Sequence, residues 1–243
     1  MLNADHILAN ADDFGLNPSV NKAIAFCFQQ GYINSASLLT NTPGFDEAVQ
    51  MIKQHVYIKN IGVHINFAEG KPLTPVHAGL LTANGNWNLK VTGKAGIILS
   101  KSQKVDLKNE LFAQINKALS QGVAINHIDS HYHLHTLPGL FNIFLDAAKY
   151  FNLKLRLAQT YREKSYLKFW YRMYINNRII TACLNYTYRF ETVAFFLANQ
   201  QHKTSKSITE VMLHPSFDEH GILTDHYDAD TMVNWINYIR ATV

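Results

Sequence analysis

Four groups of aspartate, glutamate and histidine residues each follow a short apolar stretch of this 243-residue chain. Imidazole is the most common metal ligand at neutral pH, and carboxylates bind the same divalent ions. The same side chains act as general acids and bases. The groups are Asp12 with Asp13, His64, the run from His127 to His135, and Glu210 with His214. Together they predict a site for metal binding or catalysis.

Each group taken alone also has an ordinary structural interpretation. The segment that begins with Asp12 and Asp13 reads DDFG, a common loop composition, and aspartate often caps the helix that follows. His64 lies among apolar residues, as a buried structural histidine would. His214 precedes Pro215, so a backbone bond could fix it ahead of a turn. The combination of the groups, rather than any one of them, therefore favours chemistry.

The densest group is HIDSHYHLH, residues 127–135. His131, His133 and His135 recur at every second residue, and Asp129 belongs to the same alternation. If the segment stays extended, these side chains share one face. A fortuitous histidine-rich loop and an adventitious surface metal site are the alternatives.

Apolar strand-like stretches alternate with helix-like stretches, which predicts parallel strands joined by helices. The predicted strands are 6–11, 35–39, 60–66, 124–130, 153–158 and 209–213. The predicted helices are 18–30, 44–54, 107–119 (capped by Asp106), 137–151 and 230–241, with a loop rich in Gly and Pro at 67–103. The polar groups follow four of the strands. Barrels and open sheets both bind ligands there, and we favour an α/β fold of the distorted (β/α) barrel type.

Length and composition limit the number of domains and exclude several classes of protein. A chain of 243 residues fits one α/β barrel of about 250 residues, so we expect a single catalytic domain over 1–243. The net charge of +4 is too small to indicate nucleic-acid binding. Cys27 and Cys183 form no disulfide framework, and the start of the sequence does not resemble a signal peptide. No apolar stretch approaches the roughly 18 residues of a membrane span. Two cysteines without a disulfide framework fit a reducing cytosol, so we expect a cytoplasmic protein.

Four motifs together resemble the YdjC-like carbohydrate deacetylases, in that family's order. They are ADDFG (11–15), GVHIN (62–66), HIDSHYHLH (127–135) and EVMLHP (210–215), and GKPLTPV (70–76) and LRL (155–157) also fit. The resemblance runs from about residue 6 to 220. It implies a distorted (β/α) barrel related to polysaccharide deacetylases and hydrolysis of the N-acetyl group of an amino sugar. It also implies one divalent ion bound by Asp13, His64 and His131.

The resemblance further implies that Asp12 is the general base. For the general acid that must protonate the leaving amine, His214 is the first candidate and His133 the second. Asp129 or Glu210 could orient a histidine from behind, which fixes its tautomer.

The chain departs from the family after the LRL segment. Ala158-Gln159 stands where many members carry a basic residue, so Arg156 or Arg162 is the candidate to orient the catalytic aspartate or contact substrate. Zinc and magnesium both suit an Asp-His-His set, and two imidazoles favour zinc or a similar transition metal.

Residues 160–190 form a basic, aromatic insert that we expect to be helical. It holds six cations against the single acid Glu163, and nine aromatic residues. Four interpretations stay open: a helical hairpin that covers the barrel, a sugar-binding subsite, a peripheral membrane contact and a protein contact.

The expected substrate is an N-acetylated sugar or oligosaccharide, including a lipid-linked one, and a homodimer is a family-based expectation. The alternatives are another metallohydrolase (an amidohydrolase or a phosphoesterase) and a catalytically inert sugar-binding relative. Six further histidines are expected to be structural or surface residues: His6, His55, His77, His202, His220 and His226.

Overall fold

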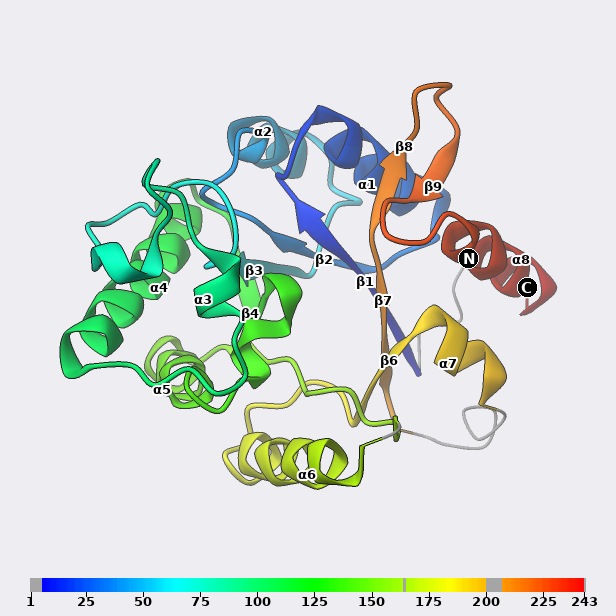
Figure 1. The fold of residues 1–243 in the computed structure, drawn as a ribbon. Helices are drawn as coiled ribbons and strands as arrows, with labels where there is room; N and C mark the ends of the chain where they lie inside the picture. Colours follow the sequence, from blue (N-terminus) through cyan, green and yellow to red (C-terminus); the bar gives the residue numbers. More distant parts are fainter. Residues whose placement is uncertain (1–5, 164, 200–206, 243) are drawn as a thin grey trace.

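The computed structural model describes residues 6–163, 165–199 and 207–242 (Figure 1). Seven parallel strands form one sheet in the order β5-β4-β3-β2-β1-β7-β6. The strands are β1 (Ile7–Phe14), β2 (Ser35–Leu38), β3 (Ile61–Ile65), β4 (Ile125–Ser130), β5 (Lys154–Leu155), β6 (Arg189–Thr192) and β7 (Thr209–Leu213). A separate antiparallel pair, β8 (Pro215–Phe217) and β9 (Leu223–Asp225), follows β7.

Helices connect the strands and surround the sheet (Figure 1). They are α1 (Pro18–Gln30), α2 (Phe45–Gln54), α3 (Leu89–Thr92), α4 (Lys101–Ser120), α5 (Phe141–Phe151), α6 (Tyr166–Thr181), α7 (Val193–Ala198) and α8 (Asp230–Thr242). Two short 3₁₀ segments are η1 (Ala78–Leu80) and η2 (His131–Thr136). Among the helices of the described residues, none combines the length and apolar character needed to cross a bilayer.

The sheet curls into a distorted barrel. Arg156, just after the edge strand β5, bonds Asp12 on β1, four strands away in the sheet order, so the contact crosses the interior. Thr160 connects the segment after β5 to the other edge strand: its backbone N donates to Phe190 O, and its Oγ1 accepts from Phe190 N at 3.1 Å. The predicted barrel class is therefore confirmed.

Side chains alternate between the two faces of the central strands. Ala9 and Ala11 of β1 belong to the apolar core, whereas Asn10 contacts Ser37 of β2 and Asp12 contacts Arg156, just after β5. The interior of the barrel is consequently polar. Gly62 belongs to the same interior, because a Cβ there would lie 2.3 Å from the ring of His127.

Local capping explains where the helices begin and end. Asn17 accepts bonds from two backbone N–H groups of the first turn of α1, and Gly31 ends the helix in a left-handed conformation. Helix α4 begins earlier than predicted because Ser100 and Gln103 form a capping box. The predicted cap, Asp106, lies within α4 and accepts a bond from His77 N instead.

The structure changes four further sequence predictions. The strand predicted at 153–158 is only Lys154–Leu155, and the 67–103 loop contains two short helices. The described part of the insert holds one helix, α6, rather than a hairpin, and its end is the barrel strand β6. Strand β6 and helix α7 were not predicted. Lys164 and His202 lie outside the described residues, as does the chain start before His6.

Candidate metal and catalytic site

A bulge at the end of β1 positions the two adjacent aspartates. The register with β2 shifts between Ala11 and Phe14, and Asp13 has a left-handed φ of 68°. Asp12 and Asp13 are both buried although they are neighbours, and their carboxylates meet different partners. Gly15 completes the turn, because its φ is +93° and a Cβ would lie 2.7 Å from Leu39 O. Backbone strain of this kind is typical of functional sites.

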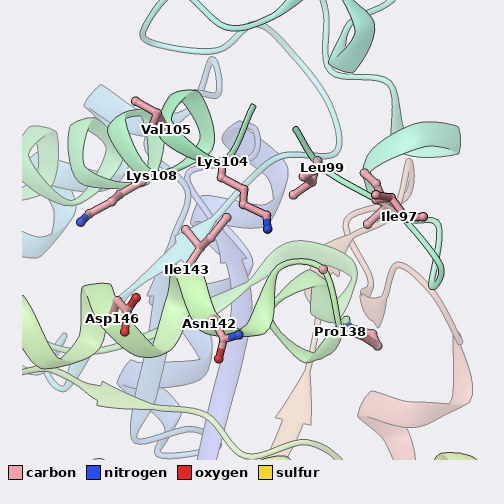
Figure 2. A pocket seen from close by; sticks show the side chains of 11 residues that line it. Ile97, Leu99, Lys104, Val105, Lys108, Pro138, Asn142, Ile143 and Asp146 are labelled. Carbon is pink, nitrogen blue, oxygen red and sulfur yellow. The ribbon is translucent and has the colours of Figure 1, made fainter. Parts of the chain in front are cut away.

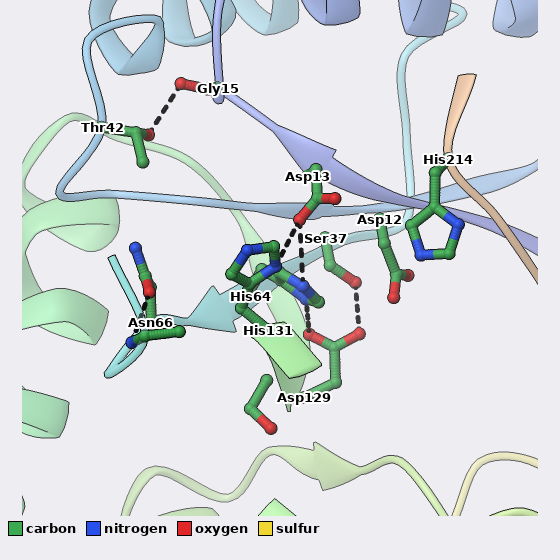
Figure 3. A network of polar contacts seen from close by, with 12 residues as sticks. Asp12, Asp13, Gly15, Ser37, Thr42, His64, Asn66, Asp129, His131 and His214 are labelled. Atoms are coloured by element: carbon green, nitrogen blue, oxygen red, sulfur yellow. Dashed lines mark hydrogen bonds and ion pairs between the residues drawn. The ribbon is translucent and has the colours of Figure 1, made fainter. Parts of the chain in front are cut away.

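Three potential ligands converge beyond the carboxyl ends of β1, β3 and β4 (Figure 3). Oδ1 of Asp13 lies 2.8 Å from Nδ1 of His131 and 3.3 Å from Nε2 of His64. All three side chains are buried. Oδ1 of Asp13 nevertheless has no hydrogen-bond partner among the described residues. A buried carboxylate oxygen without a donor, next to two imidazole nitrogens, fits a divalent cation.

The orientation of His64 is fixed from behind. Its Nδ1 lies 2.7 Å from Oδ1 of Asp129, which leaves Nε2 directed towards Asp13 (Figure 3). Ser37 Oγ in turn donates to Oδ2 of Asp129 at 2.7 Å. A carboxylate behind the imidazole is the arrangement that fixes the tautomer of metal-binding histidines.

A second group, Asp12 with His64 and Asp129, also brings ligating atoms together. Its carboxylates are already engaged by Arg156, whose two terminal nitrogens donate to Asp12 at 2.6 and 2.7 Å. Nη2 of Arg156 also lies 2.7 Å from Oδ2 of Asp129. The group with the unpaired oxygen is therefore the better metal site.

Arg156 is fully buried and organises three carboxylates. Besides Asp12 and Asp129, it donates through Nε to Glu210 at 2.6 Å. Burial raises the pKa of Asp12, but the positive charges of Arg156 and then His64 lower it by more. The pKa of Asp12 is therefore below its usual value. Burial dominates at Glu210 and raises its pKa to about 7, while Tyr186 OH donates to its other oxygen at 3.0 Å.

His214 follows β7 and has its own carboxylate partner. Oδ2 of Asp225 accepts a bond from His214 N at 2.7 Å and lies 3.5 Å from its Nδ1. Burial lowers the pKa of His214, but the bond with Asp225 and the charges of Asp12 and Asp13 together more than offset this, so the pKa is raised. A raised pKa favours the protonated imidazole, which is the form that a general acid needs.

The histidine run does not stay extended. Residues 131–136 form a tight turn in which Tyr132 and His133 have left-handed φ values of 53° and 54°. His131 alone joins the ligand group, whereas His133 packs edge-on against Phe190. His135 turns back to Ser130, whose Oγ lies 2.7 Å from its Nδ1. The prediction of one shared face is therefore wrong, because two left-handed residues break the alternation.

The two candidate acids, His133 and His214, also differ in the direction of their pKa shifts. Desolvation and then Arg156 lower the pKa of His133 to about 3, so its ring is neutral at pH 7. The lowered pKa of His133 therefore makes it the weaker candidate for the group that protonates the leaving amine. The choice of His214 as the general acid stays a prediction.

Sequence reasoning missed one histidine in the site. Nε2 of His226 bonds Oδ2 of Asp13 at 3.1 Å, so it orients the ligand carboxylate from the side opposite Oδ1. It was expected to be a structural or surface residue, because none of the four motifs of the sequence includes it. Asp225 and Ser37 were missed for a related reason: their partners are distant in sequence, and no motif marks them.

A cavity of about 300 Å³ opens above this site. Its lining comprises Asp12, His64, His131, Tyr132, His133, Met212, His214 and Tyr227. Tyr132 and Tyr227 are about half exposed, and their rings meet edge to face with centroids 6.4 Å apart. The prospective base, the acid and the two ligand histidines therefore share one opening flanked by two aromatic rings.

A larger cavity of about 550 Å³ lies elsewhere, between the segment 97–99 and helices α4 and α5 (Figure 2). Its lining is mainly aliphatic, with Lys104, Lys108 and Asp146 as its charged residues. Both groups of potential ligands in the described chain belong to the smaller cavity instead. The smaller cavity is therefore the candidate active site.

The electrostatic field of the site favours a cation. Asp129 and Asp12 outweigh the desolvation of His64 and raise its pKa to about 10. Burial alone would raise the pKa of Asp13, but nearby His131, His226 and His64 lower it well below its usual value. Positive charge is therefore stabilised where the ligand atoms converge, which is compatible with a divalent metal ion.

Known proteins resemble this chain over nearly its whole length. The sequence model of a family described as "YdjC-like protein" matches residues 6–242. A carbohydrate deacetylase from Geobacillus stearothermophilus is 33% identical over 157 residues, which are 65% of this chain and 61% of that protein. A carbohydrate deacetylase from Thermoanaerobacter pseudethanolicus is 30% identical over 224 residues, 87% of this chain and 81% of that one.

A solved structure supports the fold. An Enterococcus faecalis protein, described as a candidate cellobiose-phosphate cleavage protein, superposes with a TM-score of 0.71 at 21% identity. The match covers 97% of this chain and 89% of that one.

Proposed function

The chain belongs to the YdjC-like protein family, and from that membership we propose that it is a metal-dependent carbohydrate N-deacetylase. One observation carries the proposal. Asp12, His214 and the group of Asp13, His64 and His131 line or border one cavity, although they come from strands far apart in the sequence. An N-acetyl group is the amide that an enzyme of this kind would hydrolyse, and the products would be acetate and an amine.

Asp13, His64 and His131 would bind the metal ion. A divalent ion bound there lowers the pKa of water and polarises an amide carbonyl. Asp129 and His226 would orient two of these ligands, through the bonds to His64 Nδ1 and Asp13 Oδ2. Zinc is our first choice because two of the three ligands are imidazoles, and magnesium is the alternative.

Asp12 would be the general base. The contact with Arg156 keeps its carboxylate ionised and fixes its orientation at the floor of the cavity. Asp12 takes a proton from the attacking water as the oxygen bonds to the carbonyl carbon. Arg156 acts here as a positioning residue, and Glu210 holds its Nε from the far side.

His214 would be the general acid. The carbon–nitrogen bond breaks only when the leaving nitrogen is protonated, and His214 can give that proton because Asp225 raises its pKa. Acetic acid and the free amine then leave and become acetate and an ammonium group by proton transfer in solvent, and the proton on Asp12 returns to His214 through solvent. His133, neutral and buried, is available to donate a hydrogen bond to the carbonyl oxygen.

The proposed substrate is an N-acetylated sugar or a short oligosaccharide. The half-exposed rings of Tyr132 and Tyr227 beside the opening suit the apolar face of a sugar ring. A lipid-linked sugar belongs to the same proposal, because the cavity opens to the surface and only the acetylated ring needs to enter. Acetate release from a panel of N-acetylated sugars, free and lipid-linked, separates these substrates.

Three wider expectations stay predictions. We propose that the chain acts as one catalytic domain, that it works in the cytoplasm and that it forms a homodimer. The exposed thiol of Cys183 and the buried thiol of Cys27 are unpaired, as in a reducing compartment. Cell fractionation tests the location, and sedimentation at several protein concentrations tests the dimer.

The test of the proposed function is Asp12→Asn. This variant should keep the metal content of the wild type while acetate release falls by a factor of about 10² to 10⁴, since only the base is lost. His64→Ala and His131→Ala should lose the metal as well as activity. Full activity of Asp12→Asn would overturn the base assignment, and stoichiometric metal in either alanine variant would overturn the ligand assignment.

A further inference from the structure

Helix α6 shows the reverse of the usual surface-helix pattern. Its buried residues are Arg172, Ile175, Asn176 and Ile179, so two of the four are polar. Its outward face instead presents large apolar residues in adjacent turns. The exposed fractions are 86% for Leu167, 67% for Trp170, 60% for Tyr166, 59% for Tyr174 and 42% for Met173.

The inward polar residues fix this orientation. The side chain of Asn176 bonds both the N and the O of Ala158, at 2.7 and 2.9 Å. Arg172 donates to Gln159 and to Glu163. Because the polar face is bonded to the barrel through these contacts, the helix cannot rotate to bury its apolar face. No described residue covers that face, and contiguous exposed apolar patches mark interaction sites.

The positive charge around the exposed apolar face of α6 indicates what kind of partner it binds. Helix α6 contains no acidic residue, and Glu163 is the single acid between residues 160 and 190. Arg162 stacks over Tyr166 at 4.6 Å, and Arg178 lies 5.9 Å from the ring centroid of Tyr174. A second copy of the chain would bring the same cations against each other, because a two-fold interface pairs a surface with itself.

We propose that the outward face of α6 is a docking surface for an anionic lipid bilayer. Aromatic and aliphatic side chains bordered by Arg and Lys are the composition of helices that lie in the membrane interface. Leu167 and Trp170 insert between the headgroups, and Arg162 and Arg178, which lie beside the outward rings of Tyr166 and Tyr174, contact the lipid phosphates. The enzyme would thus work at a membrane surface, and this docking does not depend on the deacetylation reaction.

Vesicle flotation tests the proposal. The intact chain should float with vesicles of equal parts phosphatidylcholine and phosphatidylglycerol, and much less with phosphatidylcholine alone. The double variant Leu167→Ser/Trp170→Ser should bind the anionic vesicles at least about tenfold more weakly, the factor expected for one lost large apolar contact. Ile98→Ser, at a residue 95% exposed on another surface, is the matched control and should float like the wild type.

Tryptophan emission gives a second readout. Trp87 and Trp235 are buried, so Trp170 is the exposed member of the three tryptophans. Anionic vesicles should shift the emission to shorter wavelength in the wild type, and Trp170→Phe should abolish the shift. The proposal is overturned if the wild type does not float, if the double variant floats equally well, or if the double variant instead removes a dimer.

Discussion

Replacing Asp129 by Asn tests whether the carboxylate behind His64 supports metal binding. Asp129 Oδ1 lies 2.7 Å from His64 Nδ1, and both side chains are buried. Asparagine has the same shape, so the change removes the negative charge and leaves the volume of the interior unchanged. The affinity of the Asp13-His64-His131 group for zinc should fall.

The size of the effect follows from the geometry. Removing the hydrogen-bonded partner of a metal-binding histidine typically lowers metal affinity by about 10–100-fold, or about 1.4–2.8 kcal/mol. We expect the upper half of that range for Asp129→Asn. The bond to His64 is short, and burial of both partners leaves no water to replace it.

Glu210→Gln provides the matched control. Glu210 also bonds Arg156 in the barrel interior, but its side-chain bonds go to Arg156 and Tyr186 rather than to a ligand histidine. Competition with a zinc chelator at pH 8, where Glu210 with a pKa of about 7 is mostly ionised, gives both affinities. Equal affinity in Asp129→Asn and Glu210→Gln would refute the orienting role.

Three further predictions address acid–base chemistry, metal binding and packing. Asp225→Asn removes the carboxylate that raises the pKa of His214, so the alkaline limb of the pH–rate profile should move to lower pH; an unmoved limb excludes His214 as the acid. The pKa of His64 is about 10 without metal, so the ring is protonated at pH 7 and metal must displace that proton. Apparent affinity should therefore decrease as pH falls, and calorimetry in two buffers should detect about one proton released per ion; no release contradicts this. Gly62→Ala would place a methyl group 2.3 Å from the ring of His127. The clash should lower the free energy of unfolding by about 1–3 kcal/mol and with it the midpoint of urea unfolding. An unchanged midpoint would refute the close contact between Gly62 and His127.

Sequence reasoning succeeded where a residue and its role lie in one local pattern. The alternation of apolar strands with helices predicted the barrel, and strand β7 (Thr209–Leu213) has the predicted bounds. Placing polar groups at strand ends brought Asp13, His64 and His131 into one predicted site, because carboxyl ends of parallel strands meet at one rim.

It failed where long-range contacts decide the structure. Strand β6 was hidden in a basic, aromatic segment, and only its pairing with β7 defines it. His226 reaches Asp13 across 213 positions, so no local pattern could reveal it. The sequence analysis left Arg156 and Arg162 as alternatives for orienting the catalytic aspartate, and only the curl of the sheet, which brings the end of β5 opposite β1, places Arg156 on Asp12.

Acetate release during metal titration tests the central claim most directly. Enzyme stripped by a chelator would be supplied with increasing zinc or magnesium and an N-acetylated amino-sugar oligomer. Our account predicts negligible release without metal, a rise to a plateau at one equivalent of ion, and no rise in Asp12→Asn at the same metal content. Undiminished acetate release by the stripped enzyme, or no release at any metal content across a panel of N-acetylated sugars, would contradict it.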